Sequence, residues 1–90
     1  MLEVMKFKDA MQTAVADCRC RFQAVSDAQS GSGWKRCRVD YQRENGRHER
    51  VFIYLHEKSS DQSVRADVIR AIRDQEQLLF EIAGGVAESA

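Results

Sequence analysis

The sequence predicts a small α+β domain with the order αββα: a long N-terminal helix, a β-hairpin and a C-terminal helix. Apolar residues recur at three- and four-residue steps in the first and last thirds of the chain, which is typical of helices. Between them, Asn45-Gly46 separates two alternating segments, the strongest short-range hairpin signal. The 90 residues form at most one domain, so residues 1–90 are treated as a single unit.

The first predicted element is a helix over residues 2–27. One stripe of the helix collects most of its apolar side chains, and the opposite side is mostly polar. The Ser- and Gly-rich residues 28–33 are expected to end the helix and link it to the hairpin. The stripe consists of Val4, Phe7, Met11, Ala14, Val15, Cys18, Phe22 and Val25.

The predicted hairpin spans residues 34–57, and two strand registers are compatible with its turn. A two-residue Asn-Gly loop pairs Val39 with Phe52. A three-residue loop, residues 44–46 with a left-handed glycine bulge, pairs Val39 with Val51 instead. The three-residue loop gathers six apolar side chains on one face and is the preferred interpretation.

The last predicted element is a helix over residues 60–83. Ser59 with Gln62 fits a capping box, although Ser60 or Asp61 could also cap the helix. Gly84-Gly85 is expected to end it, and the tail of residues 86–90 is expected to fray. The core-facing stripe is predicted to hold Val64, Val68, Ala71, Ile72, Gln75, Leu78, Leu79, Ile82 and Ala83.

Cysteines and histidines give no indication of a metal, a cofactor or catalysis. On a helix, Cys18 and Cys20 would point about 200° apart, so they cannot bind one ion together. Cys18 and Cys37 are expected in the core, and Cys20 is expected to be exposed. His48 and His56 would lie about 26 Å apart along one strand. We therefore predict a protein that is not an enzyme.

Charge and cysteine content indicate the compartment. The three cysteines are an odd number, and charged residues interrupt the first 22 positions, so neither a signal peptide nor a membrane span is expected. A reducing cytoplasm is the predicted location. The net charge is zero, but residues 34–50 carry six bases and three acids, whereas residues 57–90 carry four bases and seven acids.

An isolated two-stranded sheet is marginal in water, so a homodimer with a four-stranded sheet flanked by helices is expected. The polar hairpin face interleaves arginines with aromatic rings, which suits a protein partner. The runner-up is single-stranded nucleic acid, and the third possibility is a small-molecule binder at a dimer interface. The predicted partner-binding residues are Trp34, Arg36, Arg38, Arg50, Phe52 and Tyr54. A second apolar strip, Ile69 and Phe80, is predicted to contact a second subunit or a partner.

Overall fold

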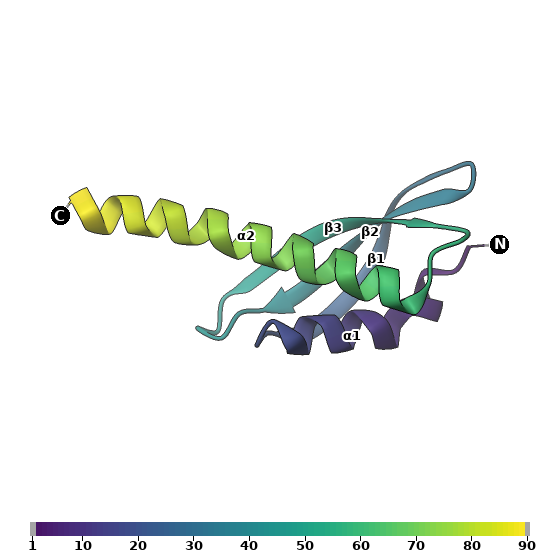
Figure 1. The fold of residues 1–90 in the computed structure, drawn as a ribbon, viewed down its shortest axis with the longest axis horizontal. Helices are drawn as coiled ribbons and strands as arrows, with labels where there is room; N and C mark the ends of the chain where they lie inside the picture. The colour runs from purple at the N-terminus through teal and green to yellow at the C-terminus, as the bar shows by residue number, and fades with distance from the viewer. Residues whose placement is uncertain (1, 90) are drawn as a thin grey trace.

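The structure is a computed structural model that describes the backbone of residues 2–89 and the side chains of residues 2–82. Two helices and a three-stranded antiparallel sheet confirm the predicted α+β class, with one more strand than expected. Both helices cover the same face of the sheet, α1 against β1 and α2 against β3, and they contact each other (Figure 1). The elements are a 3-10 turn η1 (Val4–Phe7), α1 (Lys8–Asp17), β1 (Arg21–Gly31), β2 (Trp34–Gln42), β3 (His48–His56) and α2 (Asp61–Ser89).

The prediction of one helix over residues 2–27 was wrong in its second half, because α1 ends at Asp17. Arg19 adopts a left-handed conformation with φ of 60°. The Arg19 N–H donates to the Ala16 carbonyl at 2.9 Å, and the Cys20 N–H donates to the Val15 carbonyl at 3.1 Å. These two bonds form a Schellman C-cap. A glycine usually marks such a cap, so an arginine there gave no sequence signal.

Residues 21–27 form the first part of β1, and a bulge explains why they resemble a helix. Phe22 pairs with Tyr41 and Val25 pairs with Val39, with a register irregularity between Phe22 and Ala24. The extra residue at this bulge places Phe22 and Val25 on one sheet face although they are three positions apart. Both pack against the core. The bulge therefore gives the apolar residues of this strand the three-residue spacing that is typical of a helix.

The predicted linker, residues 28–33, belongs to a second hairpin, β1–β2, and is not a flexible connection. Residues 28–31 complete β1, and Ser32-Gly33 turns the chain so that Gly31 pairs with Trp34. Gly33 has φ of 75°, a value that favours glycine. At Gly31, an added Cβ would lie 2.1 Å from the Trp34 ring, so the absence of a side chain allows the indole to pack on the backbone.

The β2–β3 hairpin has the preferred three-residue loop. The Arg43 N–H donates to the Arg47 carbonyl at 2.7 Å, and the Gly46 N–H donates to the Arg43 carbonyl at 2.9 Å. Gly46 has φ of 89°, as a left-handed bulge requires. The pairing of Val39 with Val51 is confirmed. Six side chains consequently face the helices and are buried: Cys37, Val39, Tyr41, Val51, Ile53 and Leu55.

The N-cap of α2 is one of the alternatives that the sequence left open. Ser60 is its N-cap, because the Ser63 N–H donates to the Ser60 Oγ at 3.1 Å and the Ser60 N–H donates to the Ser63 Oγ at 3.0 Å. The Ser59 Oγ instead accepts the His56 N–H at 2.9 Å. Ser60 therefore replaces Ser59 in the predicted capping box.

The predicted end of α2 at Gly84-Gly85 was wrong, because the helix continues to Ser89. Glycine in a helix interior costs about 1 kcal/mol relative to alanine, which weakens a helix without forbidding it. Of the tail predicted to fray, residues 86–89 are helical, and Ala90 lies outside the described residues. The C-terminal part of α2 projects beyond the sheet (Figure 1). The predicted core stripe is accordingly buried at Val64, Val68 and Ile72, whereas Leu78 and Ile82 are exposed.

Candidate functional site

The sheet face turned away from the helices, here called the open face, holds the predicted partner-binding residues. Alternate residues of β2 and β3 point to this face because their neighbours fill the core. No element among residues 2–89 packs on it, and the side chains of Phe52 and Tyr54 are 39% and 53% exposed. The structure brings together all six predicted residues: Trp34, Arg36, Arg38, Arg50, Phe52 and Tyr54.

Hydrogen bonds at both ends of the β2–β3 ladder explain why these side chains lie close together. The Arg43 N–H bonds to the Arg47 carbonyl, and the Glu57 N–H bonds to the Gly33 carbonyl at 3.3 Å. Both pairs belong to one uninterrupted register. Since bonded and non-bonded pairs alternate in an antiparallel ladder, the open-face pairs are the non-bonded kind, whose side chains approach most closely.

Two diagonal contacts order the open face. The guanidinium carbon of Arg36 lies 4.1 Å from the centroid of the Phe52 ring, a cation–π contact. The Trp34 and Tyr54 ring centroids lie 5.7 Å apart, with their planes tilted by 56°. All three aromatic side chains of the open face are therefore already in contact with a neighbour in the free protein. Binding a partner would then cost less side-chain entropy.

Arg38 keeps hydrogen-bonding capacity on this face. Its Nε lies 3.2 Å from the Asp40 Oδ1, yet this buried nitrogen has no hydrogen-bond partner among the described residues. The Arg38 side chain is 42% exposed overall. On the open-face positions of β2 and β3, Arg36, Arg38 and Arg50 outnumber Asp40, the one acid there. The open face is therefore positively charged and retains donors for an anionic group.

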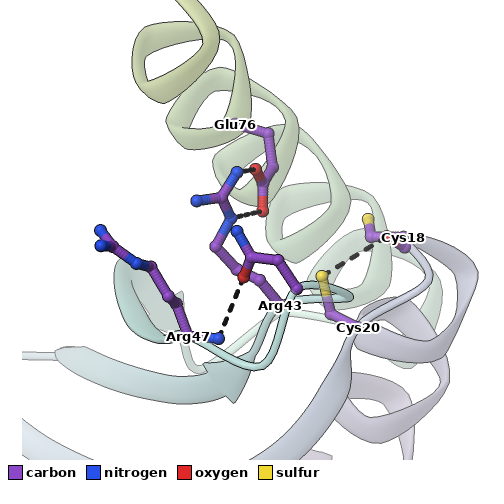
Figure 2. A network of polar contacts seen from close by, with 6 residues as sticks. Cys18, Cys20, Arg43, Arg47 and Glu76 are labelled. Atoms are coloured by element: carbon purple, nitrogen blue, oxygen red, sulfur yellow. Dashed lines mark hydrogen bonds and ion pairs between the residues drawn. The ribbon is translucent and has the colours of Figure 1, made fainter. Parts of the chain in front are cut away.

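Part of the charge separation in the sequence is satisfied within the chain. Figure 2 shows Arg43 reaching from the β2–β3 turn to Glu76 on α2. Arg43 Nε lies 3.0 Å from Glu76 Oε1, and Arg43 Nη2 lies 2.8 Å from Glu76 Oε2, so the ion pair is bidentate. Arg65 of α2 pairs with Asp17 of α1, with Nε 2.9 Å from Oδ2. The arginines of the open face take no part in these links.

Cys37 is buried as predicted, whereas Cys18 and Cys20 differ from their predicted environments. Cys18 and Cys20 are both half-buried, so the expectation of an exposed Cys20 was wrong. The cause is the early end of α1, after which the Cys20 thiol turns back and donates to the Cys18 carbonyl at 3.4 Å (Figure 2). Burial raises the pKa of Cys20 and of Cys37 to about 11. Because the thiolate is the nucleophilic form, this environment opposes thiol chemistry near neutral pH.

The histidines are placed as the sequence predicts. His48 and His56 are exposed at opposite ends of β3. Within the part of the chain that the structure describes, no group of three or more His, Cys, Asp or Glu residues is positioned to hold a metal ion.

The predicted Ile69–Phe80 strip is not one surface. Ile69 is partly buried and packs against the core, whereas Phe80 is 70% exposed. Phe80 lies in the C-terminal half of α2 with Leu78 and Ile82, which are 53% and 61% exposed. Sequence periodicity assigned Leu78 and Ile82 to the core because it could not indicate where the sheet beneath α2 ends.

Comparisons with known proteins do not identify a relative: no family model, no curated protein and no solved structure matches the chain. No helix among the described residues is both long enough and apolar enough to cross a membrane. The basis for a functional inference is therefore the chemistry of the open face.

Proposed function

We propose that the protein is a non-enzymatic binding protein, such as an adaptor, inhibitor or regulatory factor, whose open face contacts an acidic surface of another protein. The observation that supports this proposal is an uncovered sheet face carrying three arginines and three aromatic rings. Arginine, tryptophan and tyrosine are enriched at protein interfaces and among the residues that dominate binding energy. We further propose that the protein works in a reducing compartment, the cytoplasm, which the odd number of cysteines supports.

Arg36 and Arg38 are the residues expected to confer selectivity for an acidic partner. The Arg36 guanidinium lies over the Phe52 ring, and its N–H groups can still donate hydrogen bonds to a partner. The Arg38 side chain is 42% exposed, so the other N–H groups of its guanidinium are additional donors. Complementary charges of this kind speed association and disfavour basic competitors.

A charge-reversal variant tests the proposal. Replacing Arg36→Glu together with Arg38→Glu should leave the fold intact, because both side chains point away from the core. It should abolish affinity capture of a protein partner from nuclease-treated host lysate. The matched control, Arg47→Glu with Arg70→Glu, makes the same charge change at exposed positions outside the open face and should retain capture. Equal capture by both variants would contradict the proposal.

A second candidate, binding of single-stranded nucleic acid, is favoured by the exposed rings of Phe52 and Tyr54 beside the arginines. Bases stack on such rings, and Phe52→Ala or Tyr54→Ala should then each cost about 1–3 kcal/mol of binding. The affinity should also fall with salt, with a log–log slope of about −0.7 for each phosphate neutralised. Absence of a mobility shift for labelled oligonucleotides at low salt would eliminate this candidate.

A further inference from the structure

The two edges of the sheet differ in how well they are protected. β1 is an edge strand with two register irregularities, and its sequence is mostly polar. β3 is the other edge, and its nine residues pair with β2 without an interruption. Its centre, residues 51–55, carries no charge. Bulges and charged side chains are the usual protection against strand pairing, and the centre of β3 has neither.

The backbone groups available at the β3 edge follow from the hydrogen-bond alternation already described. Odd-numbered residues of β3 exchange hydrogen bonds with β2, so even-numbered residues direct their N–H and C=O groups outward. His56 is satisfied locally: its N–H donates to the Ser59 Oγ, and its carbonyl accepts the Ser59 N–H at 3.0 Å. Among the residues that the structure describes, four then present backbone groups without a partner along this edge: His48, Arg50, Phe52 and Tyr54.

An open depression of about 1010 Å³ borders the edge of β3 and also extends across β2 to Gln23 and Ala24 of β1. All five consecutive residues from His48 to Phe52 line it. Consecutive residues of a strand point to opposite faces, so the part of the hollow that touches all five passes along the edge of β3. Ala71, Gln75 and Leu78 of α2 also line it, and they would pack beneath an added strand.

We propose that this edge pairs antiparallel with β3 of a second copy of the chain, giving a continuous six-stranded sheet. Two-fold symmetric pairing centred on Val51 places His48 opposite Tyr54 of the second copy, and Arg50 opposite Phe52. All free backbone groups of the four edge residues then find partners. An arginine beside a phenylalanine repeats the contact that Arg36 already makes with Phe52 within one chain.

The sequence of β3 favours a second copy over a foreign extended peptide. In the Val51-centred register no like charges are directly opposed: Arg50 meets an aromatic ring, Glu49 meets Ile53, and Val51 meets itself. The same symmetry sets the two α2 helices side by side beneath the joined strands, with the half-exposed Leu78 on the side lining the new contact. The open faces stay uncovered on one side of the joint sheet, so the dimer presents two binding surfaces.

The substitution Phe52→Pro tests edge pairing, because the N–H of Phe52 points outward and makes no hydrogen bond to β2. Proline lacks the N–H, and it is tolerated on edge strands where that group faces outward. Sedimentation equilibrium should show dimers for the wild type and for Phe52→Ala, the control that loses the same ring. For Phe52→Pro, the dimer dissociation constant should rise about 30-fold or more, the effect of two lost hydrogen bonds per dimer. Ile53→Pro, which removes a bond to β2, should fail to fold.

Amide hydrogen exchange on the wild-type protein gives an independent result. Raising the protein concentration should slow exchange at Arg50, Phe52 and Tyr54, and should leave Val51 and Ile53 unchanged apart from global stabilisation. Three results would each overturn the inference: a monomer up to about 1 mM, equal dimerisation of Phe52→Pro and Phe52→Ala, or no concentration dependence at the even-numbered amides. The Arg36→Glu, Arg38→Glu variant should remain dimeric, which separates this inference from the proposed function.

Discussion

Replacing Arg19 by glycine should stabilise the protein although it removes a large side chain. Arg19 is exposed, and its side chain makes no hydrogen bond or ion pair with the described residues. Its φ of 60° costs a non-glycine residue about 1–2 kcal/mol. Glycine relieves this strain. Its greater conformational freedom, however, stabilises the unfolded state by about 0.4–1 kcal/mol, which offsets part of the gain. The net expectation is a gain of about 0.5–1 kcal/mol in the free energy of unfolding.

Urea denaturation and thermal melting measure this effect directly. For a domain of this size, the gain corresponds to a Tm increase of about 2–8 °C. Two controls isolate the backbone conformation. Arg19→Ala keeps the strain and should change the free energy of unfolding by less than about 0.5 kcal/mol, while Arg21→Gly, in extended β1, should lower it by about 0.5–1 kcal/mol. Destabilisation by Arg19→Gly, or equal effects of Arg19→Gly and Arg19→Ala, would refute the C-cap interpretation.

Three further predictions concern the core and the turn. The Tyr41 hydroxyl is buried without a hydrogen-bond partner among the described residues, so Tyr41→Phe should be neutral or stabilise by about 1 kcal/mol in urea denaturation, whereas loss of stability would indicate a partner. Burial raises the pKa of Cys37 from 9.0 to about 11, so the native state holds this proton more tightly than the unfolded state. The free energy of unfolding should therefore fall as the pH rises from about 9 to 11, and Cys37→Val should reduce this dependence. Breaking the Arg43–Glu76 pair with Glu76→Gln should cost about 0.5–1 kcal/mol at low salt and less at 1 M NaCl; an effect independent of salt would argue against an ionic contribution.

The sequence predicted the elements whose local signals agree with one another. Asn45-Gly46 and the alternation on both sides of it indicated a hairpin, and the six apolar residues gathered on one face favoured the register that the structure confirms. The same agreement placed Val64, Val68 and Ile72 on the buried side of α2. In both cases, periodicity and turn chemistry lead to one answer.

The third strand could not be predicted, because two local signals were misleading. The bulge after Phe22 gave a strand the spacing of a helix, and the left-handed C-cap carries Arg19 where glycine or asparagine is usual. Ser32-Gly33 was interpreted as a linker because no strand was expected before it.

The open-face residues followed from the alternation in β2 and β3 together with the preferred register, because the register decides which residues of the two strands share a face. What the sequence could not show was the contact of Arg36 with Phe52, or the ion pair of Arg38 with Asp40. Both depend on side-chain conformations on the open face. The exposure of Leu78 was also unpredictable, because it depends on where the sheet beneath α2 ends.

Site-specific photo-crosslinking tests most directly the claim that the open face contacts another protein. A photoreactive phenylalanine analogue at position 54 would sit on the open face, and the same residue at position 12 would sit on the exposed side of α1. After irradiation in nuclease-treated lysate of the native host, position 54 should give a discrete protein adduct that is lost when Arg36 and Arg38 are both replaced by glutamate. No adduct from position 54, or the same adduct from position 12, would contradict the claim.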